Sequence, residues 1–282
     1  MLIKNGWVNR FSIANLSART WLFGVVGGAI FVKSMQWDDS NIVKVEHIFL
    51  RPSVTHWLGT DSMGRDFLLR ILQGAGSSLI ISTSAISISL IFALFYGGIA
   101  AWFGKKVDVI LMSLLDVWMS LPSAVLAALV GLLLSQWNQS LFVVSLMIGS
   151  THWGRLARLI RGEVLRLREK NFIKASESMG ASELELFRDH LLPHLKPTLL
   201  IYTIYQLPNY ILTESFLSFI GLGVQPPETS WGILLQEGWR SLQVFPHVVF
   251  FPSLFLFLTI LSLNKIFSSD LFDKRAGEIS LK

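Results

Sequence analysis

The apolar residues of this chain are gathered into runs of roughly 20, the length that an α-helix needs to cross about 30 Å of hydrocarbon. The whole chain is 52% hydrophobic and only 15% charged, whereas a soluble domain usually carries about 25% charged residues. A transmembrane barrel would instead alternate polar and apolar residues in segments of about ten. We therefore predict an all-α, polytopic membrane protein.

Six transmembrane helices are predicted from these runs. The first is the weakest, because its apolar core from Trp21 to Val32 is as short as the apolar region of a signal peptide. No cleavage site of small residues follows it, so we interpret it as a retained span. The predicted spans are Thr20–Trp37, Ser78–Phe103, Val109–Leu134, Leu141–Trp153, Thr198–Leu222 and Pro246–Phe267.

The placement of Lys and Arg predicts the orientation of these spans. With the N-terminus in the cytoplasm, 18 of the 24 Lys and Arg residues fall in cytoplasmic segments and 6 in extracytoplasmic ones. The net charge of +5 is thus explained by topology rather than by nucleic-acid binding. We expect residues 1–19 and 268–282 to be cytoplasmic, on either side of a transmembrane domain over residues 20–267.

A polar arm, residues 155–197, lies between the fourth and fifth spans and holds nine of the 24 basic residues. Good helix formers predict one helix over residues 155–179, and Gly180 is placed to end it. Three apolar residues of this helix recur at i, i+3 and i+7 and form a narrow stripe. They are Phe172, Ala175 and Met179.

A second helix is predicted to begin near Glu183, because Ser182 and Glu185 have the spacing of a capping box. Pro193 and Pro197 are expected to close it before the fifth span. Its apolar face would hold Leu184, Phe187 and Leu191. Periodicity alone leaves open whether the apolar faces of the arm dock onto a partner or pack on the protein's own helix ends.

Three motifs give the chain a family resemblance. Seven residues of the arm resemble the EAA motif of bacterial ABC-importer permeases: Ala175, Ser176, Gly180, Ala181, His190, Leu192 and Pro193. Residues 56–66 and 214–232 resemble the C-type permease subunit of dipeptide, oligopeptide and nickel importers. Asp108, Asp116 and Pro122 fit the same pattern, and the resemblance covers residues 50–265. The arm departs from the motif at Lys174, Ser176 and His194.

This resemblance implies that the arm couples the spans to a cytoplasmic ATPase subunit. His190 is expected to cap or pack within the arm rather than to act in catalysis. The coupling residues would be Ala175, Ser176, Gly180, Ala181, Ser182, Leu184, Glu185, Phe187, His190 and Pro193.

The implied assembly is a heterodimer with a B-type permease subunit, two cytoplasmic ATPase subunits and an extracytoplasmic solute-binding protein. Its location would be the cytoplasmic (inner) membrane of a bacterium, in contact with membrane lipid. The chain would form half of a translocation pathway for peptides, or for nickel or another small solute.

Four polar residues are predicted within the fifth and third spans, and two of them are ionisable. Ionisable groups inside a membrane usually face a bundle interior or a water-filled cavity. Asp116, Gln206, Asn209 and Glu214 are therefore candidates for lining a pathway, and interhelical hydrogen bonding is the alternative.

The extracytoplasmic motifs supply a further set of candidate residues. Asp61 is predicted to cap a short amphipathic helix through Arg70, and Arg65 and Asp66 are expected to pair with a neighbouring subunit or with headgroups. By resemblance, residues 221–232 lie near the docking site of a solute-binding protein, and a plain connecting turn is the alternative. The candidates are Gly59, Thr60, Asp61, Gly64, Arg65, Asp66, Gly221, Gly223 and Trp231.

No catalytic or nucleotide-binding motif is recognised. Residues 98–106 resemble a phosphate-binding loop, but the glycine spacing is one residue too long and Lys106 stands where Ser or Thr is required. We expect no directly bound cofactor or metal, with ATP used by the partner subunits. Three other classes stay as alternatives: a stand-alone secondary transporter with Asp116 and Glu214 as coupling-ion sites, a membrane-bound enzyme, and a purely structural anchor.

Overall fold

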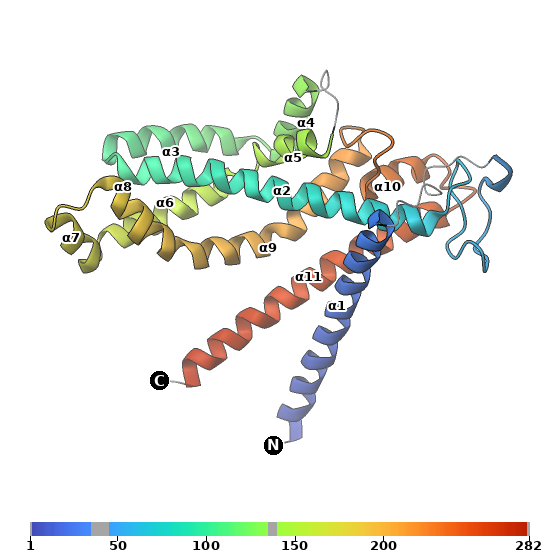
Figure 1. Ribbon diagram of the computed structural model, residues 1–282, viewed down its shortest axis with the longest axis horizontal. Coiled ribbons are helices and arrows are strands. Elements are labelled where there is room, and N and C mark those ends of the chain that lie inside the picture. Colours follow the sequence, from blue (N-terminus) through green and yellow to red (C-terminus); the bar gives the residue numbers. More distant parts are fainter. Residues whose placement is uncertain (1, 35–44, 135–139, 281–282) are drawn as a thin grey trace. The chain divides into compact units, whose positions relative to one another are not determined.

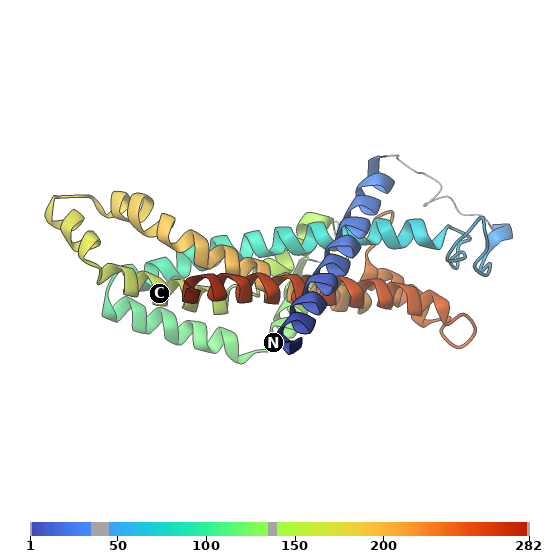
Figure 2. The same cartoon turned by 90° about the horizontal axis from the view of Figure 1, so that it is seen from below.

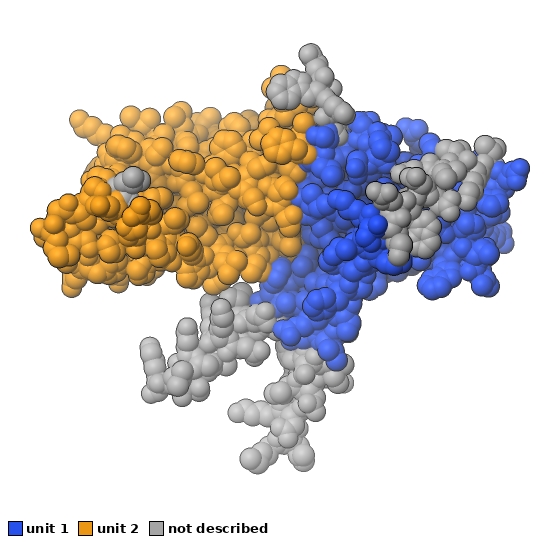
Figure 3. Space-filling view, in the orientation of Figure 1, with its two compact units in different colours: residues 1–82, 138–141, 211–282 blue, residues 83–137, 142–210 orange. Residues whose placement is uncertain are grey.

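The structure, a computed structural model, describes residues 2–34, 45–134 and 140–280, and all helices and turns named below lie within these ranges. The chain divides into two compact units (Figure 3). Unit 1 comprises residues 1–82, 138–141 and 211–282, and unit 2 comprises residues 83–137 and 142–210. The long helices α2 (Phe67–Trp102) and α9 (Leu192–Phe219) contribute to both.

Unit 1 is built on α1 (Leu2–Ser34) and α11 (His247–Ser280), which lie against each other (Figures 1 and 2). The indole Nε1 of Trp21 donates to Thr259 Oγ1 at 3.2 Å, and the Trp21 ring centroid is 5.1 Å from that of Phe255. A short helix, α10 (Trp231–Trp239), packs on α11. One 3₁₀ turn, η2 (Val45–His47), precedes the loop that leads into α2.

Unit 2 holds the remaining helices. They are α3 (Lys105–Ser120), α4 (Ser123–Leu134), α5 (Leu141–Gly149), α6 (Gly154–Arg168), α7 (Asn171–Ser178), α8 (Glu183–Glu185) and the π-helical turn η3 (Leu186–Leu191). In the figures α3 runs beside the second half of α2, and α7 and α8 form one end of this unit (Figures 1 and 2).

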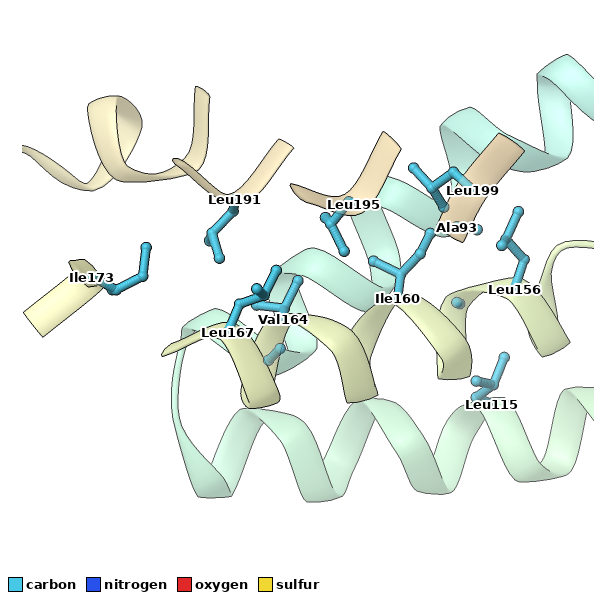
Figure 4. Packing of buried hydrophobic residues seen from close by; sticks show 12 residues of the cluster. Ala93, Leu115, Leu156, Ile160, Val164, Leu167, Ile173, Leu191, Leu195 and Leu199 are labelled. Carbon is cyan, nitrogen blue, oxygen red and sulfur yellow. The ribbon is translucent and has the colours of Figure 1, made fainter. Parts of the chain in front are cut away.

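The core of unit 2 is centred on α6 (Figure 4). Apolar residues recur along this helix at the spacing of one helical face, and all of them are buried: Leu156, Ile160, Val164 and Leu167. They point toward Leu191, Leu195 and Leu199 of the chain that enters α9. Leu115 of α3 and Ala93 of α2 belong to the same cluster.

Helices α2 and α6 meet through their backbones at Gly97. A Cβ atom at this position would overlap the carbonyl oxygen of Ala157. Only glycine allows two helices to approach this closely. The position of α6, and with it the arm that follows, is therefore fixed by a backbone contact.

The membrane spans agree only partly with the sequence prediction. Among the described residues, three segments are long and apolar enough to cross a bilayer: Asn15–Ser34, α2 and His247–Ser268. The predicted span 109–134 is two helices, α3 and α4, bent by 87°, and the bend falls at Pro122, where a helix loses a hydrogen bond. If α3 and α4 are counted together as one broken span, they form a fourth candidate span. Helix α5 has 9 residues and α9 has 28 but is less apolar, so the count of six stays a prediction.

Candidate functional site

The first part of the arm is two helices, so the predicted single helix over residues 155–179 is wrong. Helix α6 ends at Arg168, and Lys170 is extended with φ −73° and ψ 142° before α7 begins. Leu167 and Ile173 are both buried in the same core. On a continuous helix of 3.6 residues per turn they would lie about 120° apart. The break at residues 169–170 turns both side chains toward the core.

Gly180 ends α7 as predicted. It has a φ of +88°, the left-handed conformation that glycine adopts without a steric penalty. The N–H of Ala181 donates to the Ser176 carbonyl at 3.1 Å, and the N–H of Gly180 donates to the Glu177 carbonyl at 3.0 Å. These two bonds form a Schellman motif, which fixes the direction in which the chain leaves α7.

The predicted capping box is present at the start of α8. The backbone N–H of Ser182 donates to Glu185 Oε2 at 2.8 Å, and Ser182 Oγ accepts from the N–H of Glu185 at 3.4 Å. The bond from the Ser182 backbone lowers the pKa of the Glu185 carboxyl. Turn and cap together make residues 176–185 a defined corner.

The prediction that Pro193 and Pro197 close the second helix is wrong. Helix α8 continues through η3 into α9, so the helical chain passes both prolines. In the π-helical turn the N–H of Leu192 donates to the carbonyl of Phe187, five residues earlier. This wider turn ends directly before Pro193, which has no N–H with which to continue the hydrogen-bond pattern.

The π-helical turn also explains which residues of the second helix point inward. Leu186 and Leu191, five residues apart, are buried, and Phe187 is half-buried. The predicted face had included Phe187 and Leu191 but had missed Leu186, because it assumed a spacing of three and four residues. The side chain of Leu184 lies outside the described part of the structure.

The predicted apolar stripe of α7 faces outward. Ile173 and Ser176 are the buried residues of this helix, while Ala175 is exposed, and Phe172 and Met179 are 39% and 80% exposed. The arm therefore packs on its own core through one face of α7 and presents apolar side chains on the other.

His190 and Ser176 join the two halves of the arm. His190 Nε2 and Ser176 Oγ are 3.2 Å apart, which is a hydrogen bond between η3 and α7. His194 donates through Nδ1 to the His190 carbonyl at 2.6 Å, and its ring stacks on Phe172 with centroids 4.9 Å apart. Ser176 and His194 are two of the three departures from the EAA motif, and both make contacts within the arm.

The polar residues of the predicted third span pair with α6. Asp108 accepts hydrogen bonds from Arg161, and Asp116 accepts one from Arg158. The Asp116 and Arg158 side chains are 65% and 49% exposed. Two ion pairs therefore link α3 to α6, and sequence reasoning had identified only their acidic members.

Gln206 and Asn209 are brought together on α9. Asn209 Nδ2 donates to Gln206 Oε1 at 2.8 Å, and Gln206 Nε2 donates to Tyr202 Oη at 3.0 Å.

The third predicted polar residue of this helix, Glu214, is fully buried in unit 1. Ser218 Oγ donates to it at 2.7 Å and Ser215 Oγ at 3.3 Å, and the hydroxyls of Ser78 and Ser230 also bond its carboxylate.

The motif at residues 56–66 is organised around Asp61. Its carboxylate accepts hydrogen bonds from the backbone N–H groups of Met63 and Arg65 at 2.8 and 2.9 Å, and from the guanidinium groups of Arg65 and Arg70 at 2.7 Å. Burial raises the pKa of Asp61, but the Arg65 backbone bond and the charges of Arg70 and Arg65 outweigh it, so that the pKa lies below its usual value.

One prediction for this motif is wrong. Asp61 does not cap a helix: α2 begins at Phe67, and Asp66 Oδ1 accepts from the N–H of Leu69 at 3.1 Å. Arg65 and Asp66 find partners within the chain, since Arg65 binds Asp61 and Asp66 lies 2.9 Å from His56 Nδ1. Both side chains thus have partners within the chain, and their pairing with a neighbouring subunit or with headgroups stays a prediction.

Sterics explain the glycine at position 59 of this motif, and hydrogen bonding explains the threonine at position 60. Gly59 has a φ of +80°, and a Cβ there would overlap the carbonyl oxygen of Leu50. Thr60 Oγ1 accepts from the Leu50 N–H at 2.8 Å and donates to the carbonyl of His47. The motif thus closes the loop from η2 onto the start of α2.

The motif at residues 214–232 packs tightly on α2 and α9. Gly221 has a φ of +91°, and a Cβ at Gly223 would overlap the side chain of Ser218. Trp231 is fully buried, and its Nε1 donates to the Ile71 carbonyl at 3.1 Å. These three residues hold α10 in place.

Comparison with known proteins decides the family. Residues 91–276 match the family described as binding-protein-dependent transport system inner membrane component. The chain belongs to this family. It is therefore a component of a membrane transport system, and the matched region contains the arm, both ion pairs between α3 and α6, and α9 and α10.

Curated relatives of this family member are permease proteins. It is 36% identical over 211 residues to the oligopeptide transport system permease protein OppC of Haemophilus influenzae, covering 75% of this chain and 67% of that protein. It is 32% identical over 238 residues to OppC of Bacillus subtilis, covering 84% and 77%. It is 34% identical over 230 residues to the glutathione transport system permease protein GsiD of Pectobacterium atrosepticum, covering 82% and 75%.

Solved structures show the same fold. The MetNI methionine ABC transporter in inward-facing conformations aligns with a TM-score of 0.53 and 17% identity, over 72% of this chain and 96% of that chain. An amino acid ABC transporter with histidines aligns with a TM-score of 0.52 and 17% identity, over 74% and 95%. The membrane-subunit fold of ABC transporters is therefore common to these proteins and this family member.

Sequence reasoning missed several residues that complete these sites. Arg70, Thr229 and Glu237 bind within the Asp61 network, and Arg158 and Arg161 pair with α3. A signal was available for Glu237, which is an isolated carboxylate within the apolar segment of α10. Such a residue generally has a charged partner.

Proposed function

We propose that this chain is the permease subunit of an ATP-driven importer and forms half of a translocation pathway for peptides or a similar small solute. The observation that carries the proposal is the arm. Its inner face is fixed by the core, the Schellman motif and the capping box, while its outer face exposes Met179 and Phe172. A rigid body with an apolar outer face is suited to dock on a partner and to move with it.

The partners follow from this role. The arm would dock in a groove of one of two cytoplasmic ATPase subunits, a B-type permease would complete the pathway, and a solute-binding protein would deliver the solute from outside. Both termini would be cytoplasmic. The chain would bind no cofactor itself, and ATP would be hydrolysed by the partner subunits.

Peptides are the proposed substrate class because relatives at 32–36% identity are named as oligopeptide and glutathione permeases. The polar groups available to a solute include Gln206 and Asn209 of α9. Asp116 is a further candidate on the pathway side of α3, where its exposed ion pair with Arg158 would need water or a protein partner rather than lipid.

A stand-alone secondary transporter is disfavoured. Its two candidate coupling-ion carboxylates are already engaged, Asp116 by Arg158 and Glu214 by serine hydroxyls. A coupling ion would have to displace these partners in each transport cycle.

Site-directed crosslinking tests the docking of the arm. The chain has no cysteine, so Met179→Cys introduces a unique thiol on the outer face and leaves the Ser182 cap intact. In membranes that contain the ATPase subunits, we expect a crosslink to an ATPase subunit whose yield changes with nucleotide. The matched control is Val54→Cys, which is 93% exposed and extracytoplasmic in the proposed orientation, and which should give none.

Two results would overturn the proposal. The first is the absence of any ATPase crosslink from Met179→Cys in assembled complexes. The second is an equal crosslink from Val54→Cys, which would place the two positions on the same side of the membrane.

A further inference from the structure

One arginine of α6 differs from the other four, because it lacks the kind of partner that they have among the described residues. This helix carries five, and four have partners. Arg158 and Arg161 bind Asp116 and Asp108, Arg166 binds Glu163, and Arg168 donates to the carbonyls of Ala101 and Trp102 and lies over the Trp102 ring. Within the described ranges, no carboxylate lies within ion-pair distance of Arg155, and its side chain is exposed.

The position of Arg155 makes this unpaired charge costly. It stands in the first turn of α6, where the helix dipole favours an anion and disfavours a cation. The helix before it, α5, is apolar and mostly buried, so Arg155 stands at the junction between an apolar segment and the polar arm. A charge at such a place is usually compensated by an anion or by a water-filled cavity.

Neutral polar groups of α9 lie near the N-terminal end of α6, where Arg155 stands. Leu156 and Leu199 meet at that end of the core (Figure 4), and Tyr202 packs on the same cluster. The charge of Arg155 reaches both the Tyr202 hydroxyl and the His152 ring. From Tyr202 the polar row continues through Gln206 to Asn209, the last of which is exposed.

The geometry points to a subsite for the terminal carboxylate of a transported peptide, with the guanidinium of Arg155 as the anion-binding group and Tyr202, Gln206 and Asn209 as hydrogen-bonding neighbours. This inference rests on the proposed importer function and names a chemical feature of its substrate. A guanidinium binds a carboxylate through two parallel N–H donors. Amide and hydroxyl side chains can donate to and accept from peptide groups.

The subsite suits a substrate class rather than one peptide. A terminal carboxylate is common to all unmodified peptides, and the neighbouring groups are neutral, so side-chain identity would matter little. A single charged contact is also compatible with release, because passage through a pathway requires binding that is favourable but not tight.

The test uses the complete importer, with its partner permease, both ATPase subunits and one solute-binding protein, in proteoliposomes. ATP-dependent uptake is compared for one short peptide with a free C-terminal carboxylate and for the same peptide with a C-terminal amide. The ratio of the two uptake rates is the readout, and since the binding protein is the same throughout, its own preference cancels between variants.

We expect Arg155→Gln to lower the acid-to-amide uptake ratio by about tenfold, the effect of losing one hydrogen-bonded charge pair. Uptake of the amide, which lacks the carboxylate, should fall much less than uptake of the acid. Arg155→Lys keeps the charge and should retain part of the preference. Arg166→Gln is the matched control, because it removes an arginine of the same helix whose partner, Glu163, is known, and it should leave the ratio unchanged.

The outcomes separate the two proposals. No uptake of either peptide by the unsubstituted importer would contradict the importer function itself. An unchanged ratio in Arg155→Gln, or an equal loss of both peptides, would overturn the subsite while leaving that function intact. Failure of Arg155→Gln to co-purify with the partner permease, with Arg155→Lys still assembled, would assign Arg155 to a carboxylate of that subunit and would also overturn the subsite.

Discussion

Arg70 and Asp61 form an ion pair of 2.7 Å in which both residues are almost completely buried, at 3% and 1% exposure. The same Arg70 nitrogen donates to Glu237 Oε2 at 2.7 Å, and Arg70 Nη2 donates to Thr229 at 3.1 Å. One guanidinium therefore connects the loop before α2, α2 itself and α10. Removing one member of such a pair leaves a buried charge without compensation.

Asp61→Asn should therefore destabilise the protein by about 3–5 kcal/mol, the usual cost of breaking a buried ion pair. Thermal unfolding of the purified subunit in detergent or nanodiscs measures this. Arg188→Gln, which removes an exposed pair with Asp189, is the control and should show no measurable change. Equal melting temperatures for Asp61→Asn and the unsubstituted chain would show that the network adds nothing to stability.

Acid should weaken the same network. Because the folded-state pKa of Asp61 is depressed, its contribution is present at neutral pH and is lost as the pH falls below about 4, the range in which a free aspartate titrates. The unfolding temperature should drop through this range in the unsubstituted chain. The drop should be smaller in Asp61→Asn, and an identical pH profile for both would contradict the assignment.

Two glycine substitutions should differ strongly in effect. Gly180→Ala meets no atom within 4 Å but must adopt a φ of +88°, which costs about 1 kcal/mol. Gly97→Ala places a methyl group on the Ala157 carbonyl and should prevent α2 and α6 from packing. Expression and assembly with partner subunits measure both. Assembly of Gly97→Ala at the normal level would disprove the close contact.

Ser176 and His190 should be energetically coupled. Ser176→Ala and His190→Ala each remove one partner of the 3.2 Å hydrogen bond, so the double variant should cost less than the two single variants combined, by about 0.5–1.5 kcal/mol. A double-mutant cycle on unfolding free energy gives this quantity. Strict additivity would mean that the bond contributes nothing.

Glu214→Gln should retain ATP-dependent uptake, because a glutamine of the same size can hydrogen-bond the surrounding serine hydroxyls. Glu214→Ala should impair folding, since it leaves several buried hydroxyls without an acceptor. Uptake and the amount of assembled complex are measured together. Loss of uptake in fully assembled Glu214→Gln would revive a role for Glu214 as a coupling-ion site.

The parts of the arm that were predictable from sequence are those whose causes are local. Gly180 and the pair Ser182 and Glu185 act within a few residues of the chain, so their spacing alone determines the turn and the cap. The break between α6 and α7 has no such local signal, because it depends on Leu167 and Ile173 reaching one core. The proline prediction failed for a related reason, since a π-helical turn is set by packing rather than by the residues that form it.

The Asp61 network could not be predicted from the sequence, for a different reason. Arg70 and Glu237 are separated by 167 positions, and nothing in either segment indicates the other. The sequence singled out Asp61, Arg65 and Asp66, but it assigned Asp61 to a helix cap and the other two to a neighbouring subunit or to headgroups. The all-helical, membrane-spanning fold was predictable because apolar run length is itself a physical requirement of the bilayer.

The contact between Gly97 and Ala157 has a mechanical consequence. Side chains between two helices can change rotamer under load and absorb a displacement, whereas a peptide backbone pressed against another has no such freedom. In the proposed coupling role, a displacement of α6 by the arm would therefore be transmitted directly to α2 at this contact. The two helices would then move together where they touch, and any relative motion between them would have to occur away from Gly97.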